Sequence, residues 1–225
     1  MNINSDLGEG AGHDEEILPF IDSANVGCGL HAGSASITIA TARRCRELRL
    51  EVGAHPGFDD RENYGRVELP LSASEIAGLV RYQVGALAAM TQIGYVKPHG
   101  ALYHRCQADP EAAIEVVRVC ADFGVGIMGQ PGFALIEEGH KLGIPTYREG
   151  FADRAYLPDG RLAPRTQPGS VLAPQAAGEQ AIRMARSGDF DTICLHGDSP
   201  GAEKVARSIR EALRETGVQT SHLRA

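Results

Sequence analysis

The sequence lacks an excess of positive charge and any long apolar run. Its 22 basic residues face 29 acidic ones, and the net charge of −7 disfavours an extended contact with a phosphate backbone, so nucleic acid is not an expected partner. No run of about 18 apolar residues could span a membrane, and the N-terminus lacks the basic and apolar regions of a signal peptide. We therefore expect a cytoplasmic protein with no membrane partner.

Common cysteine and nucleotide motifs are missing as well. The five cysteines are odd in number and show no CxxC spacing, so they indicate neither a disulfide framework nor a zinc knuckle. The glycine-rich segment 8–12 lacks GxGxxG spacing and carries Glu9, whose carboxylate would repel phosphate. With no GxxxxGK[ST] motif either, the sequence alone shows no nucleotide-binding loop.

The chain has enough apolar residues for a full core, and its pattern predicts alternating strands and helices. With 225 residues and 43% hydrophobic content, we expect a single domain over 1–225. Strand-like runs cover 3–5, 23–27, 51–54, 95–97, 124–128, 146–148 and 192–195, and helical patterns cover 34–50, 72–93, 110–122, 132–142, 174–187 and 200–216. This alternation predicts an α/β fold with a mainly parallel sheet, either open or closed into a barrel.

Six short polar motifs each follow one of these strand-like runs. They lie at 4–9, 29–33, 53–57, 96–100, 151–154 and 195–198. In a closed barrel the carboxyl ends of all strands point to one face, whereas an open sheet would spread them along an edge. The six motifs therefore favour a barrel with one site. The irregular segment 149–174 is too long for an ordinary connection, and we expect it to be a functional loop.

The first three motifs offer groups for proton transfer or metal binding. Asp6 could merely cap a turn, but together with Glu9 it could bind a metal or activate water. His31 and His55 lie in glycine-flanked loops, where a buried structural histidine is less expected. Asp6, His31 and His55 together could bind one divalent ion and leave coordination positions open.

The fourth motif places a cation and an imidazole beside a proline. Because Pro98 fixes the backbone, Lys97 and His99 could act together on one carbonyl or phosphate group. Tyr103 follows His99 by four residues and, if this segment is helical, could orient it or a substrate. Core packing is an equally good explanation of Tyr103.

The last two motifs add an arginine and a further histidine. Arg154 could bind a substrate carboxylate while Asp153 holds the guanidinium in place, although a surface ion pair is the alternative. Asp198 could bind substrate or only cap the following helix. His196, directly before a glycine, is a candidate catalytic residue.

These motifs resemble those of the LamB/YcsF family, whose members are the A subunits of bacterial 5-oxoprolinase. The resemblance rests on residues 5–9, 23–33, 53–58, 96–103, 151–156 and 192–198, in order along nearly the whole chain. It implies a seven-stranded (β/α) barrel, a distorted TIM-like fold of the glycoside hydrolase/deacetylase type. The implied reaction opens the lactam ring of 5-oxo-L-proline to L-glutamate with hydrolysis of ATP, with Mg²⁺ accompanying the ATP, in a complex with subunits B and C.

The resemblance also implies roles for the motif residues. Lys97 and Arg154 would neutralise phosphate or carboxylate charge. Candidates for proton transfer are Asp6, Glu9, His31, His55 and His99.

The sequence departs from the family pattern at a few positions, and two other functions stay open. Ser34-Ala35 replaces an expected Asp-Pro, Val67 stands where a second arginine is usual, and the segments at 10–16 and before Asp191 are short. One alternative is a metal-dependent deacetylase or amidohydrolase that uses the three candidate metal ligands. The other is a non-catalytic subunit that binds a lactam for a partner.

Overall fold

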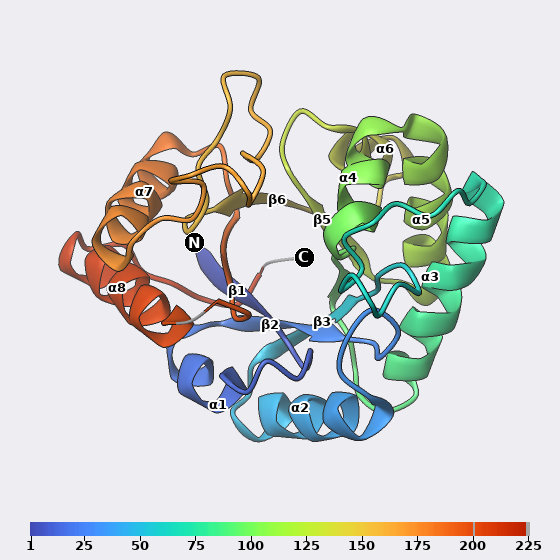
Figure 1. The fold of residues 1–225 in the computed structure, drawn as a ribbon, viewed down its shortest axis with the longest axis horizontal. Helices are drawn as coiled ribbons and strands as arrows, with labels where there is room; N and C mark the ends of the chain where they lie inside the picture. The colour runs from blue at the N-terminus through green and yellow to red at the C-terminus, as the bar shows by residue number, and fades with distance from the viewer. Residues whose placement is uncertain (200, 224–225) are drawn as a thin grey trace.

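Seven parallel strands form a closed barrel in the computed structural model, which describes residues 1–199 and 201–223. Neighbours in sequence pair with each other, and β1 also pairs with β7 to close the barrel (Figure 1). The strands are β1 (Asn2–Leu7), β2 (Ser23–Gly27), β3 (Glu51–His55), β4 (Tyr95–Val96), β5 (Gly126–Gly129), β6 (Thr146–Phe151) and β7 (Thr192–His196). The predicted α/β barrel is confirmed.

Helices surround the strands as an outer layer (Figure 1). They are α1 (Asp14–Ile17), the 3₁₀ helix η1 (Leu18–Phe20), α2 (Ala35–Glu47), α3 (Ala73–Ala88), α4 (Gly100–Ala108), α5 (Pro110–Phe123), α6 (Ala134–Leu142), α7 (Pro174–Ser187) and α8 (Ala202–Glu215). All six predicted helices are present; α7 has the predicted bounds, and the other five differ at one or both ends. Position 200, the expected start of the last one, lies outside the described residues.

Two helical features differ from the sequence expectations. Helix α3 begins at the predicted capping box of Ser72 and Glu75 but ends at Ala88, because the chain must return to the barrel, where Gly94 N donates to Val52 O at 2.8 Å. Helix α4 had no predicted boundaries. Its N-cap residue, His99, makes no side-chain cap hydrogen bond, so the usual signal for a helix start is absent.

The barrel interior is polar because polar residues alternate with apolar ones along the strands. On β1, Asn2, Asn4 and Asp6 point inward, while Ile3 and Leu7 join the apolar layer beneath the helices. The inward side chains hydrogen-bond across strands, as in the 2.8 Å bond from Asn4 Nδ2 to Thr192 Oγ1. Because buried polar groups are stable only when paired, this network fixes the register that positions the strand ends.

A glycine in β3 makes room for an aromatic ring inside this network. A Cβ at Gly53 would lie 2.1 Å from Cε2 of Tyr95, far closer than two non-bonded carbon atoms can approach. The Tyr95 hydroxyl donates to Asn25 Oδ1 at 2.7 Å, so the ring connects β4 to β2 across the barrel.

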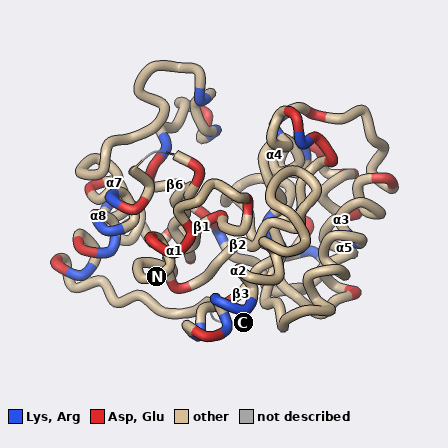
Figure 2. The backbone as a smooth tube through the Cα atoms, turned by 60° about the horizontal axis from the view of Figure 1, so that its bottom comes forward, with Lys and Arg blue, Asp and Glu red and all other residues tan. Residues whose placement is uncertain are grey.

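Charges on the outer surface are mixed in sign. Figure 2 shows acidic and basic residues interspersed along α7 and α8. Within the described ranges, no helix combines the length and apolarity needed to cross a bilayer.

Replacing Gly53 with alanine should destabilise the fold. Since the added methyl has no space beside Tyr95, we expect Gly53→Ala to lower the free energy of unfolding by about 3 kcal/mol, measured by urea denaturation. The matched control is Gly78→Ala at an exposed position of α3, where nothing lies within 4 Å of the new Cβ. Because alanine is the better helix former, the control should gain about 0.5–1 kcal/mol; equal effects of both substitutions would contradict the proposed role of Gly53.

Candidate functional site

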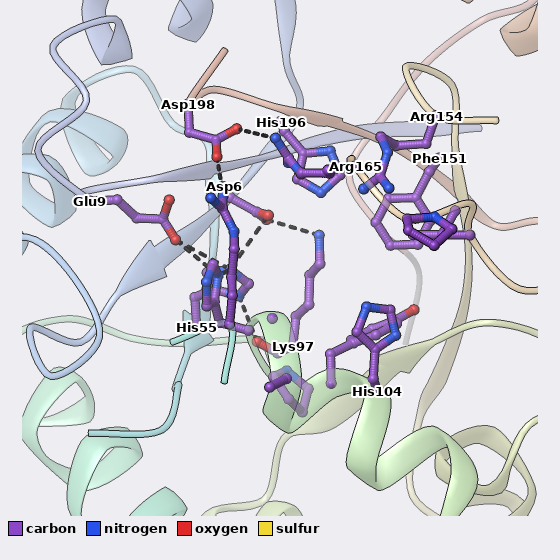
Figure 3. Close-up of a pocket in the computed structure, with 18 of the residues that line it drawn as sticks. Asp6, Glu9, His55, Lys97, His104, Phe151, Arg154, Arg165, His196 and Asp198 are labelled. Atoms are coloured by element: carbon purple, nitrogen blue, oxygen red, sulfur yellow. Dashed lines mark hydrogen bonds and ion pairs between the residues drawn. The ribbon is translucent and has the colours of Figure 1, made fainter. Parts of the chain in front are cut away.

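A cavity of about 490 Å³ opens at the carboxyl ends of the strands. Each predicted motif except the second contributes to its lining, and the side chains point toward a common centre (Figure 3). The predicted site residues that line it are Asp6, Glu9, His55, Lys97, His99, Tyr103, Arg154, His196 and Asp198. His31 lies directly behind the cavity wall, stacked on His99 with 4.0 Å between ring centroids.

Lys97 lies buried at the inner end of the cavity. Its Nζ lies 2.8 Å from Asp6 Oδ1 and 2.8 Å from Glu149 Oε1, and it donates to Cys194 Sγ at 3.0 Å. Burial opposes the charge of Lys97, but Asp6 and Glu149 outweigh it and raise its pKa well above the usual value. Lys97 is therefore a fixed cation whose charge two carboxylates already balance, and this limits its expected role in neutralising a ligand.

Asp6 is held in its ionised form between several donors. Asn25 Nδ2 donates to Asp6 Oδ1 at 2.8 Å, and His55 Nε2 lies 3.4 Å from Asp6 Oδ2. Burial works against the negative charge, yet His55 and Lys97 hold the pKa of Asp6 well below its ordinary value. An ionised carboxylate facing a cavity can accept a proton from a nucleophile.

Glu9 lies among three histidines. Its Oε1 is 2.9 Å from His31 Nε2, 3.1 Å from His99 Nδ1 and 3.6 Å from His55 Nε2. Burial disfavours the ionised form of Glu9, but His31 and His99 hold its pKa well below the usual value. Burial lowers the pKa of His31 to about 4, so this ring is neutral at pH 7.

Backbone carbonyls fix the tautomers of two of these rings. His55 Nδ1 lies 2.7 Å from Lys97 O and His99 Nε2 lies 2.9 Å from Tyr64 O; because a carbonyl only accepts, both nitrogens carry hydrogen. In the neutral rings, His55 Nε2 and His99 Nδ1 then have lone pairs that face each other at 3.0 Å, beside the Glu9 carboxylate. Three electron-rich atoms so close together require a shared proton or a cation between them.

The donor set and the charge balance fit a divalent cation. One ligand atom each from Glu9, His31, His55 and His99 lies within 4.8 Å of the others, and donors about 2.0–2.2 Å from a tetrahedral zinc ion are roughly 3.3 Å apart. Burial opposes a charge on His55, but Asp6 and Glu9 raise its pKa, so without a metal a proton on this ring balances part of the negative charge that Asp6, Glu9 and Glu149 place beside Lys97, and a bound cation would take the place of that proton. The predicted metal set included Asp6, but the structure pairs that carboxylate with Lys97 and brings Glu9 and His99 to the two histidines.

His196, which lines the cavity, forms a second hydrogen-bonded pair with Asp153. Asp153 Oδ2 accepts from His196 Nδ1 at 2.9 Å and from His196 N at 3.1 Å. Burial opposes its charge, but His196 lowers the pKa of Asp153. With Nδ1 bound to Asp153, His196 presents Nε2 as the nitrogen free for a ligand. The expectation that Asp153 holds Arg154 in place is therefore wrong, because this aspartate orients His196.

Arg154 is buried, and backbone carbonyls rather than a carboxylate hold its side chain. Nε donates to Ser170 O at 3.3 Å and Nη2 to Ala163 O at 2.6 Å. Burial and the nearby Arg165 lower the pKa of Arg154. The long loop between β6 and α7 thus folds back on itself to present this guanidinium to the cavity.

Tyr103 is buried against Phe151 and Cys194, as the core-packing explanation expects, and both Tyr103 and Asp198 line the cavity. Tyr103 donates from its hydroxyl to Glu149 Oε2 at 3.2 Å, so it supports a buried carboxylate rather than His99. Asp198 binds Arg66 and Arg165, while the N-cap residue of α8 is Gly201.

Four important residues had not been singled out from the sequence: Tyr64, Arg66, Glu149 and Arg165. Glu149 was assigned to the start of the loop, but β6 extends to Phe151 and turns this side chain inward. An alternation of Tyr147, Glu149 and Phe151 was the available signal. Tyr64, Arg66 and Arg165 lie in irregular loops, where no periodicity indicates direction.

Comparison with known proteins places this cavity in a family. Residues 1–225 match the LamB/YcsF family over their full length. The chain belongs to this family. It is 42% identical to the 5-oxoprolinase A subunit of Chloroflexus aggregans, covering 97% of this chain and 96% of the relative. It is 40% identical to the 5-oxoprolinase A subunit of Thermus thermophilus, covering 97% and 98%. The predicted family is confirmed.

Solved structures agree on the fold. The crystal structure of a lactam utilization protein from Thermus thermophilus superposes with a TM-score of 0.89 at 39% identity, covering 98% of each chain. A family 4 carbohydrate esterase from Streptomyces lividans gives a TM-score of 0.57 at 11% identity, covering 99% of this chain and 91% of the esterase. The second likeness shows only that the barrel architecture is shared.

The imidazole and carboxylate cluster should bind a divalent ion. We expect the chelator-treated protein to take up one equivalent of Co²⁺ or Zn²⁺ at neutral pH, because a cation relieves the repulsion between the facing lone pairs. His99→Ala and Glu9→Gln should each weaken the affinity by about 100-fold, measured by isothermal titration calorimetry and, for Co²⁺, by visible absorption.

The matched control is His140→Ala, which removes an exposed imidazole on α6. It should leave the affinity unchanged. Failure of the unaltered protein to take up either metal would mean that a shared proton, rather than a cation, joins His55 and His99.

Proposed function

We propose that this chain is the A subunit of a multi-subunit 5-oxoprolinase, which hydrolyses the lactam amide of 5-oxo-L-proline to L-glutamate with hydrolysis of ATP. Relatives about 40% identical over nearly their full length carry that name. The observation that carries the proposal is the cavity itself, whose inner end holds groups for proton transfer and whose outer end holds a buried guanidinium. A small lactam acid needs both.

The chemistry requires activation before water can attack. Resonance stabilises the amide of the ring, so transfer of a phosphoryl group from ATP to the amide oxygen would make the ring carbon electrophilic. One water then adds to this carbon, the C–N bond breaks, and the nitrogen takes a proton. The resulting acyl phosphate reacts with a second water to release glutamate and phosphate.

The residues of the cavity suit these steps. Asp6 is the candidate general base for the attacking water, since Lys97 and Asn25 keep it ionised and in place. His196 is the candidate acid for the departing nitrogen, with Asp153 as its positioning residue. Arg154 is the candidate partner of the substrate carboxylate.

Cofactors and partners complete the proposal. A divalent cation bound by Glu9, His31, His55 and His99 would supply Lewis acidity toward a carbonyl oxygen. ATP with Mg²⁺ is the co-substrate, and subunits B and C are the expected partners, since the names of the relatives describe one component of a larger enzyme. We also expect a cytoplasmic location, where ATP is present.

One alternative has support in a specific observation. The facing lone pairs of His55 and His99 favour a metal-dependent amidohydrolase or deacetylase that needs no ATP. A non-catalytic subunit that only binds a lactam is the remaining alternative, and it gives no reason for the Asp153–His196 pair.

Reconstitution should distinguish these functions. We expect glutamate to form from 5-oxo-L-proline only when this chain, candidate B and C subunits, ATP and Mg²⁺ are all present. Chromatography of the amino acid product measures the glutamate formed. Product without ATP would support the amidohydrolase. An active mixture that tolerates both Asp6→Asn and His196→Asn would support the binding role.

Asp153→Asn should reduce turnover in the assembled enzyme without abolishing substrate binding. Because asparagine neither fixes the same tautomer nor stabilises the protonated ring, we expect kcat to fall roughly 10²–10⁴-fold with KM little changed. A fall in kcat at little-changed KM, with thermal unfolding unaffected, distinguishes this positioning role from a merely structural one. Asp159→Asn, an exposed site on the same loop, is the control and should keep the kcat and KM of the unaltered enzyme.

A further inference from the structure

Two arginines from different loops bind one carboxylate at the cavity mouth. Arg66 follows β3, Arg165 lies in the loop after β6, and Asp198 follows β7. Arg165 Nη1 lies 3.3 Å from Asp198 Oδ1, while Arg66 Nη2 pairs with the other oxygen, Oδ2. The two guanidiniums therefore already hold a two-oxygen anion between them, supplied by the protein itself.

The third arginine strengthens the positive potential of this end. Arg154 forms none of the ion pairs found among the described residues, and its hydrogen bonds use Nε and Nη2 only. Arg66, Arg154 and Arg165 all line the same cavity. Against them stand Asp198 and Asp153, and Asp153 is engaged by His196, so the outer end keeps excess positive charge in a protein whose net charge is −7.

The cavity has more room than a small lactam acid requires. Its volume of about 490 Å³ lies within the range of roughly 300–1,000 Å³ that is typical of drug-sized ligands. In the proposed reaction the phosphoryl group stays on the substrate from activation until the acyl phosphate is hydrolysed. A subsite for this group must then exist in the same cavity as the proton-transfer residues.

We propose that Arg66 and Arg165 form a phosphoryl-binding subsite, in which Asp198 occupies the position of the phosphoryl oxygens until a ligand displaces it. The inference rests on the proposed function for the identity of the substrate. Arg154 remains beside it for the carboxylate. Bidentate guanidinium groups suit phosphoryl oxygens, and the exchange of one anion for another keeps both arginines paired throughout.

Inorganic phosphate tests the subsite in the isolated chain by isothermal titration calorimetry. The unaltered protein should bind phosphate, and Arg66→Gln and Arg165→Gln should each weaken binding roughly tenfold or more. Asp198→Asn should tighten it, because the competing charge is gone. The matched control is Arg161→Gln. Arg161 lies on the same loop as Arg165, but its guanidinium pairs with Asp159 and is not part of the cavity lining. The Arg161→Gln variant should bind phosphate as the unaltered protein does.

Absence of phosphate binding by the unaltered protein would overturn the subsite, as would unchanged binding by both arginine variants or no gain from Asp198→Asn. Arg66 is 41% exposed in its side chain, so Arg66→Gln should fold normally, with thermal unfolding as the check. This titration needs no turnover. A failed reconstitution therefore contradicts the proposed function but not the phosphoryl subsite. If the assembly is active and this chain binds no phosphate, the subsite is contradicted and the proposed function is not.

The assembled enzyme distinguishes the two sources of the phosphoryl group. If the group is carried on the activated substrate, Arg66→Gln and Arg165→Gln should release less glutamate per ATP consumed than the unaltered enzyme. If the subsite holds only free phosphate, that ratio should stay constant and product inhibition by phosphate should disappear.

Discussion

The site depends on the buried ion pairs that the ammonium group of Lys97 forms with Asp6 and Glu149. A buried charge is tolerated only when it is paired and hydrogen-bonded, and each of these three groups would be costly to bury alone. Asp6 lies on β1, Glu149 lies on β6 and Lys97 directly follows β4, so together they connect these strands through the middle of the barrel. The closed sheet makes this possible, since only a barrel brings those three strand ends to one point.

Charge is divided along the cavity as a consequence. The inner end has more carboxylates than cations and gathers imidazoles that face one another, so it favours a metal ion or a proton. The outer end has more arginines than free carboxylates and favours an anion. A ligand with an electron-rich carbonyl at one end and an acidic group at the other would therefore bind in one orientation.

The sequence located the inner half of this cavity better than the outer half. Asp6, His55 and Lys97 end apolar runs, and parallel pairing brings such positions together whatever the details of the loops. The side chains with which these residues interact were harder to predict from the sequence. Nothing local distinguishes Glu9 from Asp6 as the neighbour of His31, because that choice depends on a left-handed turn at Gly8 and on packing between loops. Glu149 was missed because two charged residues in succession obscured the end of β6.

Arg154 and Asp198 of the outer half were among the predicted site residues, but their partners could not be predicted, because tertiary contacts set the direction of these loops. Arg165 and Arg154 belong to a loop whose course follows backbone bonds such as Leu172 N to Asp153 O, which no sequence periodicity encodes. The same difference separates the tasks of the two halves. Groups that transfer protons need fixed positions, which rigid strand ends provide, whereas an anion site that exchanges Asp198 for a ligand needs the freedom that loops allow.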